Sequence, residues 1–229
     1  MSAPATRRTA LLAGATGLIG GHLLDLLLVE ASYSRIVALV RRPLDLEHGK
    51  LDARVVDFDH LDETADPPPV DDVFCCLGST IRKAGSQAAF RKVDHDYVVA
   101  TARLGLACGA RRFLLVSAIG ASSSAKTFYS RVKGEAEESV TALGYPALHI
   151  FQPSILMGAR QENRPGERLG IAAARVLNGL MVGPLSPYRG IRPETVAAAM
   201  VAAAASATEG RQVHTYSEIE RLAQAFARE

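Results

Sequence analysis

The sequence predicts an α/β fold with a doubly wound parallel sheet and a small C-terminal lobe. Over residues 9–155, short apolar runs alternate with longer segments of helical period, and this alternation is typical of a parallel sheet. The apolar runs are continuous, as expected for strands that helices cover on both faces. A glycine-rich turn follows the first run. Length and pattern together favour a single domain over residues 1–229.

The expected strands lie at residues 9–13, 36–40, 54–56, 73–77, 113–117 and 148–151. The expected helices run from the glycine turn to about residue 30, over 94–108 and over 127–143. After residue 153 the alternation fades into an arginine-rich loop, a helix near 169–177, a Gly/Pro-rich stretch over 183–193 and an alanine-rich helix. We interpret residues 154–229 as a small substrate or cover lobe within the domain. A ligand crevice at the carboxyl ends of the strands follows from this topology.

Composition argues against some classes of partner. The chain is 48% hydrophobic and 22% charged, and its formal net charge of +2 gives no field that would attract a nucleic acid. No apolar run reaches the length needed to cross a membrane. The three cysteines, Cys75, Cys76 and Cys108, form no pattern, which fits a reducing compartment. We therefore expect a cytoplasmic protein with neither a nucleic-acid nor a membrane partner.

The glycine-rich turn is the most informative motif. Its residues are Gly14, Ala15, Thr16, Gly17, Leu18, Ile19 and Gly20. Glycine lets the backbone turn tightly and approach a phosphate closely, and the first amides of the following helix point at negative charge. The spacing Gly-x-x-Gly-x-x-Gly is less common than Gly-x-Gly-x-x-Gly, so the strand-turn-helix context carries part of the argument. The turn predicts a Rossmann-like fold in which a dinucleotide pyrophosphate docks here.

The end of the second expected strand indicates which dinucleotide is bound. Arg41 and Arg42 follow this strand, and no carboxylate occurs before Asp45. Two guanidinium groups suit a 2′-phosphate, whereas an acidic residue would take the ribose 2′-hydroxyl. The pair therefore predicts NADP(H) as the cofactor, although a solvated strand end would have the same sequence. Asp57 and Phe58, just past the third strand, are candidates for contacts with the adenine.

The candidate catalytic residues are Tyr129 and Lys133, one turn apart at the start of an expected helix. A tyrosine has a pKa of about 10 and exchanges a proton poorly at neutral pH unless a nearby ammonium stabilises the phenolate. Lys133 can supply that charge and reach the nicotinamide ribose. Ser117, at the end of the fifth strand, is expected to point into the same crevice and orient a substrate carbonyl. Tyr-x-x-x-Lys is common by chance, but together with the glycine turn it indicates hydride transfer.

The glycine turn, Ser117 and residues 129–133 resemble the short-chain dehydrogenase/reductase superfamily over residues 9–155. Further motifs are similar to the atypical branch that contains the Tat-interacting-protein oxidoreductase-like proteins. They are CCLGST at 75–80, KAGS at 83–86, DHDYV at 94–98, VKGE at 132–135 and, most specific, RQENRPGE at 160–167. The resemblance implies an NADPH-binding Rossmann fold with Gly78, Ser79 and Thr80 beside the cofactor. Leu77 and Pro153 are further candidates for cofactor contacts. The resemblance implies no particular substrate.

Two departures from the branch pattern bear on the site. Gln152-Pro153-Ser154 stands where Arg-Pro-Gly is usual, which changes the charge expected on the substrate side. Ser117-Ala118 stands where a serine pair is usual, which leaves Ser117 as the natural orienting hydroxyl and the serines at 122–124 as substitutes. Five arginines could contact an anionic group or be solvated: Arg160, Arg164, Arg168, Arg189 and Arg192.

Three functions from different classes fit these residues. The first is an NADPH-dependent oxidoreductase acting on a small carbonyl or alcohol, because the C-terminal lobe is short for a nucleotide sugar. The second is an NADP(H)-binding regulatory or scaffold protein without turnover. The third, which the short lobe disfavours, is an epimerase-like isomerase. The histidines show no ligand spacing, so no metal is expected, and a homodimer through the helices over 94–108 and 127–143 is open.

Overall fold

The computed structural model describes residues 7–61, 68–157, 189–206 and 208–228. In this part of the chain, one seven-stranded sheet has the order β3-β2-β1-β4-β5-β6-β7, and each neighbouring pair of strands is parallel. The strands are β1 (Arg8–Ala13), β2 (Tyr33–Val40), β3 (Leu51–Val55), β4 (Asp72–Cys75), β5 (Arg112–Val116), β6 (Ala147–Phe151) and β7 (Gly210–His214). The predicted doubly wound parallel sheet is confirmed.

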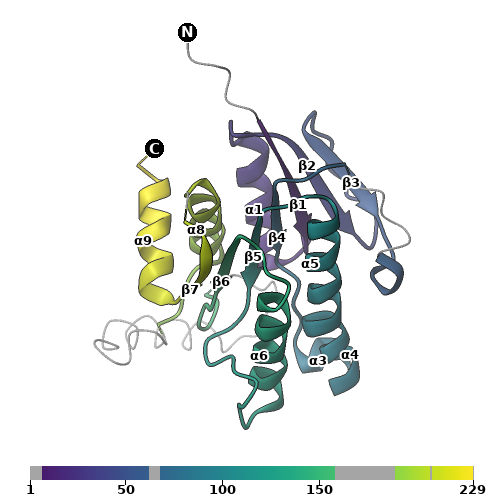
Figure 1. Ribbon diagram of the computed structural model, residues 1–229, viewed down its shortest axis with the longest axis vertical. Coiled ribbons are helices and arrows are strands. Elements are labelled where there is room, and N and C mark those ends of the chain that lie inside the picture. The colour runs from purple at the N-terminus through teal and green to yellow at the C-terminus, as the bar shows by residue number, and fades with distance from the viewer. Residues whose placement is uncertain (1–6, 62–67, 158–188, 207, 229) are drawn as a thin grey trace, which may run out of the picture.

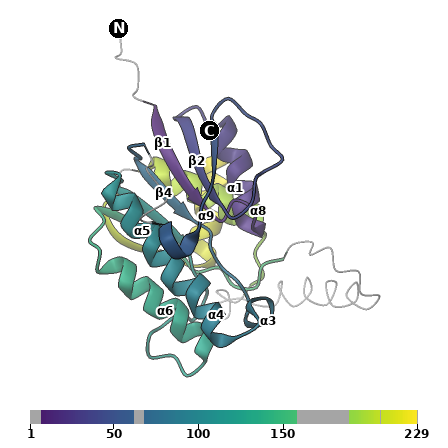
Figure 2. The same cartoon turned by 90° about the vertical axis from the view of Figure 1, so that its right-hand side faces the viewer.

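Helices cover both faces of the sheet. The longer ones are α1 (Leu18–Val29), α5 (Tyr97–Ala107), α6 (Phe128–Thr141), α8 (Pro193–Ala205) and α9 (Tyr216–Phe226). α1 and α8 lie on one face with α9 beside α8, and α5 and α6 lie on the other (Figure 1 and Figure 2). The molecule therefore has three layers, α/β/α. No helix in the described ranges is both long and apolar enough to span a membrane.

The central strands are apolar without a break because both of their faces are buried. Successive side chains of a strand point to opposite faces. In β1, Ala10 and Leu12 pack with α1 and α8, whereas Leu11 and Ala13 pack in the cluster on the α5 side. All four are fully buried. This is the arrangement that a continuous apolar run predicts.

The segment between β4 and β5 differs from the single helix expected over residues 94–108. It consists of α3 (Ile81–Ala84), α4 (Gln87–Arg91), the π-helical turn η2 (Lys92–Asp96) and α5. A π-helical turn adds a residue to the helical repeat and rotates the next part of the helix about its axis. The inward side chains are consequently Asp94, Val98, Thr101 and Ala102, all fully buried. The wide turn thus brings a carboxylate into the interior beside α6.

The chain after β6 returns to the main sheet. β7 pairs with β6 along its length, and α8 packs against α1. β7 was not expected from the sequence, because it is an edge strand in which only Val213 is a large aliphatic residue. The helix expected near 169–177 lies outside the described residues, and a covering role for residues 154–229 stays a prediction.

Candidate functional site

A cavity of about 670 Å³ opens at the carboxyl ends of β1, β2 and β4. This is the switch point of the sheet, because the chain runs outward from β1 to β3 and then returns to β4 beside β1. Its walls come from the glycine turn, the end of β2, the 3₁₀ turn η1 (Phe58–His60) and the segment after β4. The cavity therefore lies where the topology predicts a ligand crevice.

The glycine turn makes the close contacts that its sequence predicts. Gly14 has a φ of +90°, and a Cβ on it would lie 2.6 Å from the carbonyl oxygen of Cys76. A Cβ on Gly20 would lie 2.0 Å from the carbonyl oxygen of Gly14. Only glycine fits at either position, and α1 consequently starts directly against the end of β1.

The first turn of α1 can receive an anion. Gly17 is the N-cap, no side chain caps the helix and its first turn has no acidic residue. The first amides are therefore free to point at a phosphate, and the helix dipole favours negative charge there. Gly14, Thr16 and Gly17 line the cavity. The other predicted members of the turn lie outside the lining: Leu18, Ile19 and Gly20.

The charged residues of the lining are all basic. They are Arg41, Lys83 and Lys92. Lys92 pairs with Asp59 at 2.7 Å, whereas Arg41 and Lys83 form no ion pair with the described residues. No aspartate or glutamate occurs among the described lining residues, so none there would bind a ribose diol through a carboxylate. Of the two predicted arginines, Arg41 lines the cavity and Arg42 is exposed outside the lining.

Two aromatic side chains form an apolar part of the wall. Phe58 and Tyr97 both line the cavity, and their ring centroids are 5.4 Å apart. Phe58 therefore lies where a contact with an adenine was predicted. The Asp57 carboxylate instead accepts a hydrogen bond from the Asp59 N–H at 3.0 Å, which caps η1, and Asp57 lies outside the lining.

The segment after β4 contributes Leu77, Gly78 and Ser79 to the lining. Thr80 lies just outside it and caps α3, because its hydroxyl oxygen accepts from the Lys83 N–H at 3.2 Å. Pro153 is buried, and its carbonyl accepts from the Ile119 N–H at 3.0 Å. Of these five candidate cofactor contacts, three therefore line this cavity, and the other two, outside the lining, accept hydrogen bonds from backbone N–H groups.

Lys133 forms a buried ion pair directly behind this wall. Its Nζ lies 2.9 Å from Oδ1 of Asp94, and Oδ2 of Asp94 accepts from the Ser79 N–H at 2.9 Å. Burial, the largest single influence, would lower the pKa of Lys133, but the Asp94 carboxylate together with Tyr129 and Cys75 outweighs burial and raises it. A Cβ on Gly78 would lie 3.5 Å from both Oδ1 of Asp94 and Nζ of Lys133. The ion pair thus fixes Lys133 as a cation one residue layer from the cavity.

Tyr129 lies one turn before Lys133 on α6, as predicted. Its side chain is half-buried, and its ring centroid is 5.4 Å from that of Phe90. The negative charge of a Tyr129 phenolate is one of the influences that raise the pKa of Lys133. The one-turn spacing places the two side chains on the same face of α6, which is the arrangement that proton exchange at Tyr129 requires.

Ser117 is engaged with a carboxylate that the sequence reasoning missed. The Ser117 hydroxyl donates to Oε1 of Glu137, and Nε2 of Gln152 donates to Oε1 and Oε2 of Glu137 at 2.9 and 3.1 Å. Gln152, which stands where the branch pattern usually has arginine, is thus one of the residues that contact this carboxylate. The candidate substitutes for Ser117 turn toward other partners: Ser122 and Ser124 contact each other, and Ser123 donates to Glu138.

Several residues of the site were not predicted, among them Lys83, Asp94 and Glu137. Glu137 could have been found from its spacing, because it lies four residues after Lys133 on the same helix face. Asp94 was part of a recognised motif, but its inward direction depends on the π-helical turn. Lys83 reaches the cavity only because two short helices follow β4.

Comparisons with known proteins agree with this geometry. The sequence profile of a family described as NAD(P)H-binding matches residues 14–147. Protein HTATIP2 of Rattus norvegicus is 41% identical over 166 residues, which cover 71% of this chain and 68% of that protein. This chain belongs to the NAD(P)H-binding Rossmann family of atypical short-chain dehydrogenases/reductases. Another relative, the mitochondrial protein FMP52 of Eremothecium gossypii, is 34% identical, with 69% of this chain and 70% of that protein covered.

Several solved structures share the fold of this chain at lower sequence identity. MoeE5 in complex with UDP-glucose and NAD is 17% identical, with a TM-score of 0.65 over 95% of this chain and 81% of that one. The oxidoreductase ylbE of Lactococcus lactis is 23% identical, with a TM-score of 0.54 over 69% of this chain and 73% of that one. Both likenesses confirm the Rossmann-like architecture.

Proposed function

We propose that this protein is an NADP(H)-dependent oxidoreductase that transfers hydride to or from a small carbonyl or alcohol substrate. The observation that carries the proposal is the charge of the cavity, whose described lining holds Arg41, Lys83 and Lys92 and no carboxylate. Such a lining favours the dinucleotide with an additional 2′-phosphate, because guanidinium and ammonium groups bind phosphate and only a carboxylate would favour the free 2′-hydroxyl.

The residues present fit that cofactor. The first amides of α1 would hold the pyrophosphate, and Arg41 with Lys83 would hold the 2′-phosphate. The bound nicotinamide would supply the hydride chemistry. Tyr129 would exchange a proton at the substrate oxygen, and the ammonium of Lys133 would stabilise the phenolate that this exchange creates.

Titration of the purified protein with NADPH, NADP⁺, NADH and NAD⁺ by calorimetry tests the cofactor. We expect both phosphorylated forms to bind at least about tenfold more tightly than their unphosphorylated counterparts, because the 2′-phosphate meets two cations. Equal affinity for NADPH and NADH would contradict the proposed cofactor.

Turnover is tested with NADPH and a panel of aldehydes, ketones and quinones. Tyr129→Phe should abolish turnover and leave NADPH affinity within a few-fold, because the hydroxyl is needed for proton exchange and not for docking. The second candidate function is NADP(H) binding without turnover. It is favoured by one observation, that Ser117 and Lys133 both contact carboxylates of the protein itself. Binding of NADPH by a wild-type protein that reduces nothing in the panel would select it.

We further propose that the protein works in a reducing, cytoplasmic environment. Its three cysteines are free thiols, and burial raises the pKa of Cys75 to about 12, so this thiol is unreactive. Relatives from fungi are named mitochondrial, so cell fractionation should score organelle and cytosol separately. Recovery with an organelle fraction would contradict the proposal.

A further inference from the structure

Three titratable side chains share one stripe of α6. Tyr129, Lys133 and Glu137 follow one another at intervals of four residues, so they lie on the same face of the helix. The first two are the proposed proton-exchanging pair. The third is only 4% exposed and does not take part in the chemistry described above. A carboxyl group this deeply buried needs hydrogen-bond partners. The partners of Glu137 determine whether it accepts or donates a hydrogen bond.

Glu137 accepts hydrogen bonds from residues that follow two strands and forms an ion pair with a residue of a third strand. The Ser117 hydroxyl follows β5, the Gln152 amide follows β6, and a guanidinium nitrogen of Arg211 in β7 lies 3.6 Å from Oε2. Lys133, on its own helix, adds a second positive charge nearby. Because a carboxylate can only accept, the hydrogen of the Ser117 hydroxyl is committed to Glu137 while Glu137 is ionised.

We propose that Glu137 is a positioning residue that sets the hydrogen-bond polarity of Ser117, and with it which form of the substrate the site binds. While Glu137 is ionised, Ser117 presents only lone pairs, which accept from an alcohol hydroxyl. When Glu137 carries a proton, its own hydroxyl donates to Oγ of Ser117, and the Ser117 hydrogen is released to donate to a carbonyl oxygen. The proton comes from solvent, and no covalent bond to carbon changes. This inference rests on the proposed function, since it concerns the same site.

Opposing influences act on the pKa of Glu137. Burial raises its pKa above the ordinary value for a glutamate, and hydrogen bonds from Ser117 and Gln152, the Arg211 guanidinium and the Lys133 ammonium oppose this rise. The carbonyl form of the substrate should therefore bind better on the acid side of this pKa, and the alcohol form on the alkaline side.

The hydrogen bond itself can be tested without turnover. In protein labelled with ¹³C at the glutamate carboxyl carbons, the signal lost in Glu137→Gln identifies Glu137, and its chemical shift is followed against pH. Ser117→Ala should raise the pKa of Glu137 by about one unit, because a donor to the ionised form is lost. An unchanged pKa would overturn the proposal whether or not the protein turns over any substrate.

The effect on the substrate is tested by the pH dependence of KM for a carbonyl from the panel and for its alcohol with NADP⁺. In the wild type, the two KM values should move in opposite directions across the pKa found by NMR. Glu137→Gln is isosteric, and its amide can donate to Ser117, so it should remove this dependence and raise the alcohol KM about tenfold while leaving the carbonyl KM near its best value.

Glu138→Gln is the matched control. Glu138 is the next residue, is exposed and also accepts from a serine, Ser123, but it lies outside the stripe. It should leave both KM profiles unchanged. Parallel KM profiles in the wild type, or the same change in both variants, would overturn the polarity role. Failure of the wild type to reduce any carbonyl would overturn the proposed function alone, and the NMR titration would still decide the contact.

Discussion

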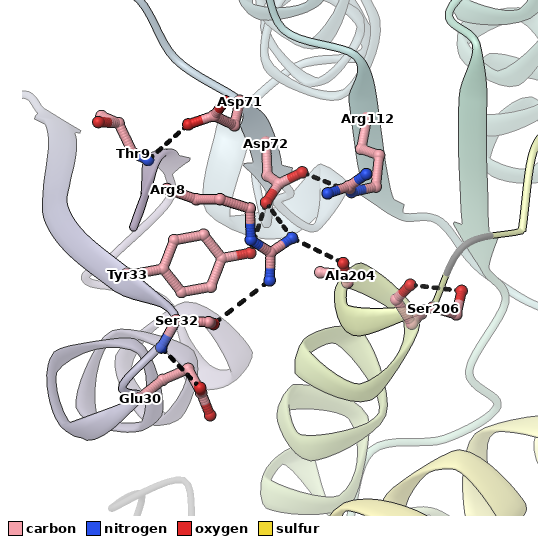
Figure 3. Close-up of polar contacts among 11 residues, drawn as sticks. Arg8, Thr9, Glu30, Ser32, Tyr33, Asp71, Asp72, Arg112, Ala204 and Ser206 are labelled. Carbon is pink, nitrogen blue, oxygen red and sulfur yellow. Dashed lines mark hydrogen bonds and ion pairs between the residues drawn. The ribbon is translucent and has the colours of Figure 1, made fainter. Parts of the chain in front are cut away.

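The two ends of the sheet use equivalent positions in opposite ways. At the amino end, the first residues of four strands meet (Figure 3): Arg8 of β1, Tyr33 of β2, Asp72 of β4 and Arg112 of β5. Asp72 is fully buried and contacts a nitrogen of Arg8 at 2.7 Å, the hydroxyl of Tyr33 at 2.6 Å and Nε of Arg112 at 2.6 Å. Arg8 also donates to the carbonyl of Ala204 in α8 at 2.8 Å. Each charge of this cluster therefore faces a partner within the protein.

At the carboxyl end, the residues just past the same strands are Gly14, Arg41, Cys76 and Ser117. Three of them line the cavity, and Arg41 has no ion-pair partner in the described part of the chain. Charge left unpaired at this end contributes little to folding, but it is available to a phosphate. The difference indicates that the amino end stabilises the fold, whereas the carboxyl end is reserved for a ligand.

The largest expected effect on stability comes from removing the carboxylate at the centre of the Asp72 cluster. Asp72→Ala removes the acceptor shared by Arg8, Tyr33 and Arg112 and leaves buried polar groups uncompensated, so the free energy of unfolding should fall by about 3–5 kcal/mol. Urea denaturation measures this fall. The NADPH affinity of the protein that remains folded should not change, because Asp72 is at the opposite end of the strands.

Asp71→Ala is the control for that substitution. Asp71 is exposed and accepts from the Thr9 N–H at 2.7 Å (Figure 3), so its loss should cost only about 1 kcal/mol. Equal destabilisation by the two variants would show that the Asp72 cluster has no special role in stability.

Acid should lower the free energy of unfolding through a buried histidine pair that lies between the two ends of the sheet. His149 of β6 is buried and contacts His214 of β7 at 3.0 Å, and burial, with the charges of His214 and Arg112, lowers the pKa of His149 to about 4. The unfolded chain takes up this proton at its ordinary pKa of about 6.5. Stability should therefore be full above pH 6.5 and fall by at most about 3 kcal/mol as the pH drops toward 4.

The measurement is the free energy of unfolding between pH 7 and pH 4. His149→Gln should flatten the curve over this range, whereas His48→Gln should not, because His48 is exposed. A slope that persists in His149→Gln would assign the acid sensitivity to other groups.

Local patterns predicted most of the fold and the start of the site. The glycine turn, the apolar strands and the Tyr129–Lys133 spacing each depend on residues a few positions apart, so a single sequence displays them. The pairs Ser117–Glu137 and Lys133–Asp94 depend on how separate elements meet, and the second also on a π-helical turn that apolar periodicity does not reveal. The Asp72 cluster depends on strand register.

A side chain inside the glycine turn should lower cofactor affinity at the carboxyl end of the sheet without destabilising the fold. A Cβ on Gly17 would lie 3.2 Å from the carbonyl oxygen of Gly14, a tight contact that a small shift of the turn relieves. Gly17→Val would, however, place a branched group at the proposed pyrophosphate site, and we expect NADPH affinity to fall about 100-fold, or about 2.7 kcal/mol. Calorimetry gives the affinity, and thermal unfolding of the same samples gives the stability. Unaltered affinity would mean that the turn is only structural.

The smallest expected effect separates two adjacent arginines. Arg41 lines the cavity and Arg42 does not, although the sequence alone gives both the same role. Arg41→Ala should weaken NADPH about tenfold and leave NADH unchanged, because one of the two cations that we propose face the 2′-phosphate is lost and NADH has no such group. Arg42→Ala has the same change in net charge and should alter neither affinity by more than about twofold, since Arg42 lies outside the lining and solvent screens its charge from a ligand in the cavity. If the two variants weaken NADPH equally, the selectivity comes from the overall positive charge of this sheet end. If only Arg41→Ala does so, a direct contact with the phosphate accounts for it, and the unpaired charge at the carboxyl end has a specific use.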